Sequence, residues 1–159
     1  STLDRSSAAS DVYKRQDKIL FVKLSPNAKD ITEVAKAVEE AGADGISLIN
    51  TILAMAVDFN KRENVFKNDY AGLSGPAVKP IALRMTHQVK RAVDIPVIAM
   101  GGICSYRDAL EFIMVGASAV EVGTYNFMNP KGPQEIIEDL ENYLVDKNEY
   151  LKDLVGIIK

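Results

Sequence analysis

The sequence predicts an α/β fold in which four βα units form half of an eight-stranded (β/α)8 barrel, with a small hairpin insert. Short apolar runs alternate with amphipathic helical patterns, which is typical of a parallel sheet with helices outside it. Each run ends in a polar or glycine-rich loop, and such loops meet at one face of a barrel. No G-x-G-x-x-G motif follows the first strand, where a doubly wound dinucleotide fold would carry it.

Composition and charge argue against several function classes. The 159 residues carry a formal net charge of −3 with both signs interspersed, which argues against binding to nucleic acid or membrane surfaces. No apolar run approaches the ~20 residues of a membrane helix. With one cysteine and one histidine, the chain forms no internal disulfide and no Cys/His zinc site, and a cytoplasmic location is expected. His87 is expected to be structural or on the surface, and Cys104 has no paired base that would make it a nucleophile.

Residues 1–16 differ from the rest of the chain. They show neither helical nor strand periodicity, and they lack the apolar middle of a signal peptide. We expect a foreign or disordered leader over residues 1–16 and the barrel half over residues 17–159.

The first βα unit begins at an abrupt change to apolar residues. Residues 19–24 form an apolar run typical of a fully buried strand. Asp30 then caps a predicted helix, with Glu33 in the position that a capping box requires. Residues 46–49 are expected as the second strand.

The segment after the second strand is long and polar. Residues 50–75 contain alternating pieces near residues 57–59 and 65–67, which predicts a hairpin insert. Pro76 then begins a helix at its first turn. Four apolar residues of this helix are expected to face the core: Ile81, Met85, Val89 and Val93.

The last two βα units complete the pattern. Residues 97–100 and 119–122 are expected as strands. Between them, Ser105 and Asp108 repeat the capping-box spacing at a helix start. A terminal helix is expected after Asn129 and Pro130, followed by a short helix within residues 149–159. The terminal helix carries the apolar residues Ile136, Ile137, Leu140 and Leu144.

The loops after the last two strands are candidate phosphate-binding elements. Glycine lets backbone N–H groups approach a ligand closely, and the corresponding loops of β/α barrels commonly form a phosphate site. We therefore expect a phosphate cradle made of Gly101, Gly102, Gly123 and Thr124. A single Gly-Gly pair would indicate an ordinary βα turn, but the two loops together favour the phosphate site.

Other polar positions follow the first two strands. Lys23 ends the first strand, where its ammonium either extends into solvent or stabilises an electron-rich cofactor or anionic substrate. Asn50 and Thr51 follow the second strand, and an asparagine suits both a turn and a planar amide-containing ring. The loop at residues 72–76, with two glycines around a serine, is equally consistent with a ligand loop and a linker.

Five segments together resemble the dihydroorotate dehydrogenase family. Each is a weak signal alone, but all five occur in the family's order and spacing. The resemblance runs from about residue 17 to 145, implies the C-terminal half of a TIM barrel, and is closest to class 1, especially the NAD-linked subclass 1B. The segments are Lys-Leu-Ser-Pro at 23–26, Ile-Asn-Thr at 49–51, Gly-Leu-Ser-Gly-Pro-Ala at 72–77, Met-Gly-Gly-Ile at 100–103 and Gly-Thr at 123–124.

The resemblance implies an FMN enzyme that oxidises dihydroorotate to orotate in de novo pyrimidine (UMP) biosynthesis. By position, Lys23 would contact the flavin ring and Ile49 would pack beside it. Asn50 and Thr51 would hydrogen-bond the substrate. The FMN, chiefly its phosphate, would be held by Gly75, Gly101, Gly102, Gly123 and Thr124. No metal site is implied.

The resemblance also implies partners and a missing part. NAD-linked members work with a second subunit that carries FAD and an iron–sulfur cluster, and a homo-oligomer is expected for the complete protein. The class 1 base is a cysteine after the fourth strand, in a half that we expect to be missing here, so no catalytic residue is assigned and Cys104 does not take that role. We expect the isolated chain to be an inactive fragment that is poorly soluble or self-associates through exposed sheet edges.

Two rival functions stay open. Another FMN barrel, such as the pyrimidine-reducing domain of dihydropyrimidine dehydrogenase, would share the glycine loops and Lys23. A flavin-free phosphate-binding barrel isomerase or lyase would share the glycine loops only. That function would not explain why the Lys-Leu-Ser-Pro and Ile-Asn-Thr segments occur together.

Overall fold

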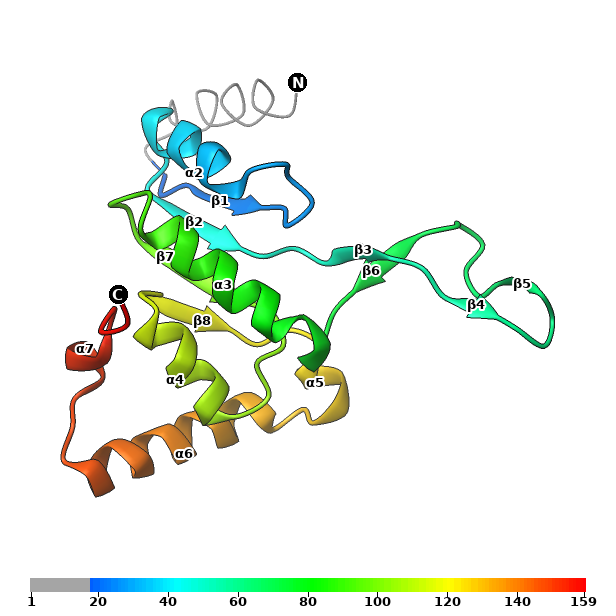
Figure 1. The fold of residues 1–159 in the computed structure, drawn as a ribbon. Helices are drawn as coiled ribbons and strands as arrows, with labels where there is room; N and C mark the ends of the chain where they lie inside the picture. The colour runs from blue at the N-terminus through cyan, green and yellow to red at the C-terminus, as the bar shows by residue number, and fades with distance from the viewer. Residues whose placement is uncertain (1–17) are drawn as a thin grey trace.

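The central sheet has four parallel strands. The computed structural model describes residues 18–159, so the leader predicted for residues 1–16 lies outside the described residues. The strands are hydrogen-bonded in chain order, which confirms the predicted α/β fold with a parallel sheet (Figure 1). They are β1 (Phe21–Leu24), β2 (Gly45–Leu48), β7 (Val97–Met100) and β8 (Ala119–Glu121).

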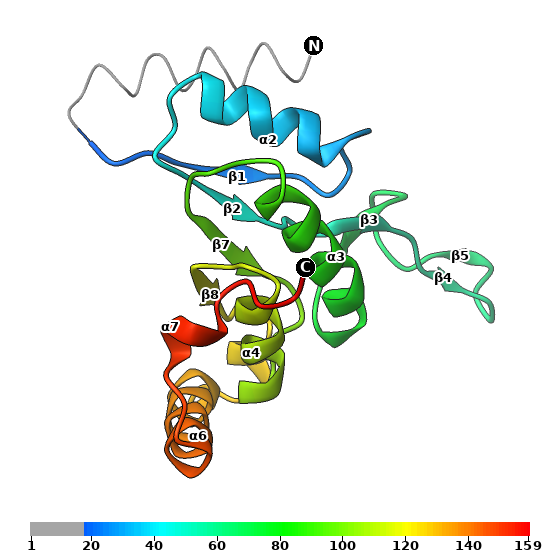
Figure 2. The same ribbon diagram turned by 60° about the vertical axis from the view of Figure 1, so that its left-hand side comes forward.

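Three helices connect these strands, and they lie on one side of the sheet (Figures 1 and 2). They are α2 (Ile31–Glu40), α3 (Lys79–Lys90) and α4 (Tyr106–Met114). When strand order follows chain order without reversal, right-handed crossovers keep every helix on the same face. A doubly wound sheet reverses its strand order and covers both faces. The topology therefore favours the barrel arrangement, and the half barrel itself stays a prediction.

The predicted helix caps are present. The side chain of Asp30 accepts the backbone N–H of Thr32 at 2.8 Å and that of Glu33 at 3.3 Å. Ser105 Oγ accepts the backbone N–H of Asp108 at 3.3 Å. Both caps satisfy N–H groups that a helix leaves without partners at its first turn, and so α2 and α4 begin where the sequence predicts.

The core lies between the sheet and its helices. The expectation that Ile81 faces this core is wrong, since Ile81 is 39% exposed while its neighbour Ala82 is fully buried. A 3-10 turn (Pro76–Val78) precedes α3, whose buried face repeats at the 3.6-residue period and leaves Ile81 off that face. The buried residues of α3 are Ala82, Met85, Thr86 and Val89.

The first strand is less buried than expected. Ile19 is 81% exposed and Phe21 is 40% exposed, so the prediction of a fully buried strand is wrong for this run. In the described residues β1 pairs only with β2 and forms one edge of the sheet, which leaves it open where a central strand would be covered. Strand β2, which has neighbours on both sides, is buried throughout.

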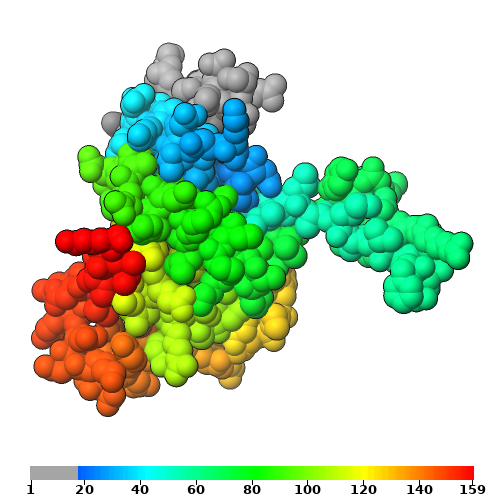
Figure 3. All heavy atoms as spheres, viewed as in Figure 1, coloured from blue at the N-terminus to red at the C-terminus, as the bar shows by residue number. Residues whose placement is uncertain are grey.

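Residues 52–73, within the predicted segment 50–75, form an arm that extends away from the body (Figures 1 and 3). The predicted hairpin insert is confirmed, although its second strand lies earlier than residues 65–67. The arm contains two antiparallel ribbons, β3 (Ile52–Ala54) with β6 (Ala71–Leu73) and β4 (Val57–Asp58) with β5 (Glu63–Asn64). Its large exposed apolar side chains include Leu53, Met55, Val57, Phe59, Val65, Phe66 and Tyr70.

The C-terminal part adds three helices, α5 (Tyr125–Met128), α6 (Gly132–Lys147) and α7 (Leu151–Leu154), of which α5 is not predicted from the sequence. Helix α6 buries Ile136, whereas Ile137 is 57% exposed. None of the helices in the described part of the chain is long and apolar enough to cross a membrane.

Candidate cofactor-binding site

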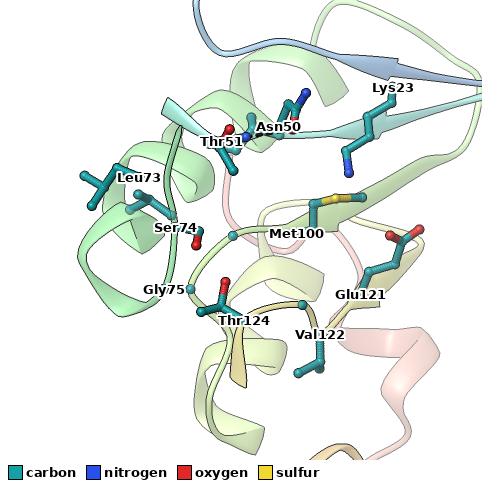
Figure 4. Close-up of a pocket in the computed structure, with 15 residues that line it drawn as sticks. Lys23, Asn50, Thr51, Leu73, Ser74, Gly75, Met100, Glu121, Val122 and Thr124 are labelled. Carbon is teal, nitrogen blue, oxygen red and sulfur yellow. Dashed lines mark hydrogen bonds between the residues drawn. The ribbon is translucent and has the colours of Figure 1, made fainter. Parts of the chain in front are cut away.

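A cavity of about 210 Å³ lies where the carboxyl ends of the strands meet (Figure 4). All nine site residues predicted from the sequence line it, although they come from segments that are far apart in the chain. They are Lys23, Ile49, Asn50, Thr51, Gly75, Gly101, Gly102, Gly123 and Thr124. The fold therefore brings the predicted set together at the end of a parallel sheet where ligands commonly bind.

Two glycines after β7 allow the loop to lie against the start of α3. Gly102 has a φ of +77°, and a Cβ on it would lie 2.8 Å from Gly75 O and 2.9 Å from Lys79 Cβ. Gly101 has a φ of +134°, and its Cβ would lie 2.7 Å from Ala82 Cβ. Larger residues would be strained here by backbone angle and by contact. The result is a pocket wall made of backbone, which suits close approach of an anionic group.

Polar side chains stand at opposite ends of the cavity. Figure 4 shows Lys23 and Glu121 on one side of Met100, and Ser74 and Thr124 on the other. Lys23 comes from β1 and Glu121 from β8, so the two edge strands of the described sheet contribute opposite charges. Glu121 was not predicted as a site residue, although its place near the end of a strand, two positions before the loop at Gly123, is the same signal that identified Lys23.

Asn27 is a second residue that the sequence analysis missed. Its Nδ2 donates to Thr51 O at 3.3 Å, and its Oδ1 accepts the backbone N–H of Leu53 at 3.1 Å. Asn50 Oδ1 accepts the backbone N–H of Thr51 at 2.9 Å. These bonds fix the loop after β2 from both sides. Asn27 follows a Ser-Pro turn, but its partners are too distant in sequence for a local pattern to indicate them.

A charged cluster lies behind the Gly101–Gly102 loop, and we call Lys79, Asp108 and Glu111 the anchor cluster. Lys79 Nζ is 2.5 Å from Asp108 Oδ1 and 2.8 Å from Glu111 Oε2. Burial raises the pKa of Asp108, but hydrogen bonds from Lys79, Ser105 and the Cys104 N–H outweigh it and leave this pKa below 3.8. Burial lowers the pKa of Lys79, but its bonds to Asp108 and Glu111 raise it above 10.5. Both groups therefore stay charged at neutral pH.

Cys104 and His87 lie outside this cavity. Burial, and then the charge of Asp108, raise the pKa of the Cys104 thiol, so Cys104 is mainly protonated at neutral pH. His87 lines a separate, larger cavity of about 410 Å³ together with Lys90 and Arg91, and this cavity contains none of the predicted site residues. No group of three or more His, Cys, Asp and Glu residues in the described part of the chain is placed to hold a metal ion.

The fold and the pocket define a parallel β/α protein with a cavity at the carboxyl ends of its strands. The chain belongs to the dihydroorotate dehydrogenase family, because the model of that family matches residues 4–144. This range begins inside the predicted leader, whose origin stays a prediction.

Similar proteins with the name "Dihydroorotate dehydrogenase B (NAD(+)), catalytic subunit" occur in several bacteria. The chain is 52% identical to that of Petrotoga mobilis over 154 residues, which are 96% of this chain and 51% of the relative. It is 53% identical to that of Thermoanaerobacter sp. (strain X514) over 150 residues, 94% of this chain and 50% of the relative. It is 57% identical to that of Desulforamulus reducens over 138 residues, 86% of this chain and 45% of the relative. The chain thus spans about half the length of the curated relatives that it matches.

Proposed function

We propose that this chain is the flavin-holding part of an FMN-dependent dihydroorotate dehydrogenase that forms orotate in pyrimidine biosynthesis. The observation that carries the proposal is the meeting of all nine predicted residues in one cavity. The names of the similar proteins favour this reaction over that of a dihydropyrimidine dehydrogenase domain or a flavin-free barrel enzyme.

The backbone wall of the cavity fits the phosphate end of FMN. Backbone N–H donors can bind a phosphate where no side chain intervenes, and Gly101 and Gly102 leave that space clear. Gly75, Gly123 and Thr124 complete this wall. When bound, FMN supplies hydride acceptance, which no amino-acid side chain provides.

The opposite end of the cavity suits the ring and the substrate. The Lys23 ammonium favours negative charge beside it, and Ile49, which is 4% exposed, offers an apolar surface for packing against a ring. Asn50 and Thr51 provide polar groups for the amide and carboxylate groups of dihydroorotate. The bonds from Asn27 hold this loop in place before any ligand arrives.

The proton-abstracting base is proposed to lie in a part of the enzyme that these residues do not include. Cys104 does not line the cavity, and the raised pKa of its thiol disfavours the thiolate at neutral pH. We therefore propose that the isolated chain binds flavin without turning over dihydroorotate. A separate electron-transfer subunit is proposed for the complete enzyme from the words "catalytic subunit" in its relatives' names. The FAD and iron–sulfur cluster of that subunit, and a homo-oligomeric state, are proposed from the family resemblance alone.

Flavin titration tests the proposal directly. The purified chain should quench FMN fluorescence with saturation, and orotate should then shift the flavin absorbance band more than uracil does. Dihydroorotate added without oxygen should leave the flavin oxidised. Absence of FMN binding would rule out the cofactor assignment, and a larger effect of uracil would favour the dihydropyrimidine alternative. Rapid bleaching of the flavin would contradict the inactivity of the isolated chain.

A further inference from the structure

The ammonium of Lys79 is paired with two carboxylates of the protein. Its Nζ lies 2.5 Å from Asp108 Oδ1 and 2.8 Å from Glu111 Oε2, and its side chain is only 23% exposed. Lys79 is not among the residues that line the cavity. A lysine held in this way serves as an anchor between helices and is not available to bind a ligand phosphate.

The second carboxylate oxygen of Asp108 holds the loop after β7. Oδ2 accepts the backbone N–H of Cys104 at 3.1 Å and the hydroxyl of Ser105 at 2.8 Å. The side chain of Asp108 is 17% exposed, so these bonds are partly shielded from competing water. One carboxylate therefore joins the first turn of α3 to the loop that carries Gly101 and Gly102.

The consequence for the cavity appears at Gly102. Its α-carbon is so close to the start of α3 that an added Cβ would meet both Gly75 O and Lys79 Cβ within 3 Å. A shift of Lys79 relative to the loop would therefore change the spacing between Gly75 and Gly102. These two residues belong to separate loops of the proposed phosphate wall.

We propose that Asp108 is a positioning residue for the cofactor phosphate, because it bridges Lys79 and the Cys104–Ser105 backbone and so fixes Gly102 against Gly75. This inference rests on the proposed function, since it requires a phosphorylated flavin in the cavity. Asp108 acts through the loop and does not touch the cofactor.

Charge alone predicts a different outcome from positioning. If the cluster acted only through its field, Asp108→Ala would remove a negative charge near the phosphate and strengthen FMN binding. Lys79→Met would leave the charges of Asp108 and Glu111 without their lysine partner and would weaken FMN binding. Positioning predicts that both substitutions weaken FMN binding, because each one breaks the same bridge.

The experiment compares FMN with riboflavin, which has the same ring and no phosphate, by fluorescence quenching on the purified chain. Lys79→Met and Asp108→Ala should each weaken FMN binding roughly tenfold. Riboflavin affinity should stay within about twofold, which shows that the ring site and the fold persist. Lys79→Arg, which keeps the positive charge, should bind FMN nearly as tightly as the wild type does. Lys131→Met, at an exposed position outside the cavity, is the matched control.

Each outcome has a distinct meaning. If the wild-type chain binds neither flavin, the proposed function and this inference both fail. If the wild type binds FMN and riboflavin equally, the phosphate wall and its positioning fail while flavin binding stands. If both variants prefer FMN over riboflavin as strongly as the wild type does, the positioning role of Asp108 is overturned and the phosphate wall stands. Tighter FMN binding by Asp108→Ala would overturn the positioning role in the same way.

Hydrogen exchange gives a readout that needs no ligand. The amide of Cys104 donates to Asp108 Oδ2, so its exchange should accelerate in Asp108→Ala. The amide of Ala99, within the buried strand β7, should exchange as in the wild type if the fold is intact. Unchanged exchange at Cys104 would show that Asp108 does not hold the loop.

Discussion

Lys79 and Asp108 are joined by an ion pair of 2.5 Å across 29 positions of sequence. Lys79 begins α3 and Asp108 lies in the first turn of α4, so the pair ties together two helix starts that flank the loop after β7. Because the loop carries the glycines of the candidate phosphate wall, the shape of the cavity depends on residues outside it.

The pair should make stability depend on pH at both extremes. The pKa of Asp108 is lowered in the folded chain, so its stabilisation is present above 3.8 and is lost as pH falls through the lower folded value. The pKa of Lys79 is raised, so its contribution is complete below 10.5 and is lost as pH rises through the higher folded value. In urea unfolding, the stability difference between wild type and Asp108→Asn should shrink as pH falls below 3.8. A difference in unfolding free energy that stays constant from pH 2 to pH 7 would contradict the assignment.

Cys104 should react slowly with alkylating agents near neutral pH. Its pKa is raised by burial and by the charge of Asp108, while Lys79 partly opposes this effect. Only the thiolate is nucleophilic, so the rate with iodoacetamide should increase steeply as pH rises toward and beyond 9. Asp108→Asn should react several-fold faster at pH 8. The same thiol in urea-unfolded chain is the reference, and a native rate equal to that reference would contradict the prediction.

Gly102→Ala should destabilise the fold and weaken FMN binding. The added Cβ would lie 2.8 Å from Gly75 O at a φ of +77°, which together should cost about 1–3 kcal/mol of unfolding free energy. Gly123→Ala is the matched comparison, because a Cβ there meets nothing within 4 Å. It should change stability by less than about 0.5 kcal/mol. Equal thermal midpoints for the two variants would show that the Gly75–Gly102 contact is not tight.

Ile136 and Ile137 are adjacent isoleucines with opposite environments. Ile136 is 6% exposed and belongs to the core, whereas Ile137 is 57% exposed. Ile136→Ala should lower the free energy of unfolding by about 2–4 kcal/mol, and Ile137→Ala by less than about 0.5 kcal/mol. Denaturant melts of both variants check this, and a larger effect at Ile137 would indicate that another surface covers this face of α6.

The arm should be the first place in the described part of the chain to be cut by trypsin. Lys61 and Arg62 are exposed between β4 and β5, and Arg62 has a φ of +56°. Ion pairs of Lys61 with Asp58 at 3.9 Å and Glu63 at 4.0 Å are exposed, so they should give little protection. Mass spectrometry of brief digests should find this cut before any within α3. The double variant Lys61→Gln, Arg62→Gln should lose it.

Local sequence signals predicted the elements well because each of them has a local cause. The caps at Asp30 and Ser105 depend on hydrogen bonds within three residues. The glycine loops follow strands, and parallel strands bring their carboxyl ends to one edge, so the pocket residues were predictable as a set. The inferred roles of Lys23 and Asn50 depend on resemblance and stay proposals.

The errors concern features that are set by distant parts of the chain. The exposure of Phe21 depends on β1 being an edge strand, which its own apolar run does not reveal. Ile81 lies just beside the buried stripe of its helix, where a short window does not resolve which face packs inward. The bridge from Asp108 to Lys79 has no local pattern at all, since its two ends belong to different βα units.

The cavity is lined by Lys23 of β1 and Glu121 of β8, so it spans the sheet from one described edge to the other. A ligand bound there would contact both β1 and β8, which share no hydrogen bonds with each other, and would link them. By mass action, an occupant at 100 times its dissociation constant adds about 2.7 kcal/mol to the free energy of unfolding. The supply of that small molecule in the surrounding solution would then help to set what fraction of the chain is folded.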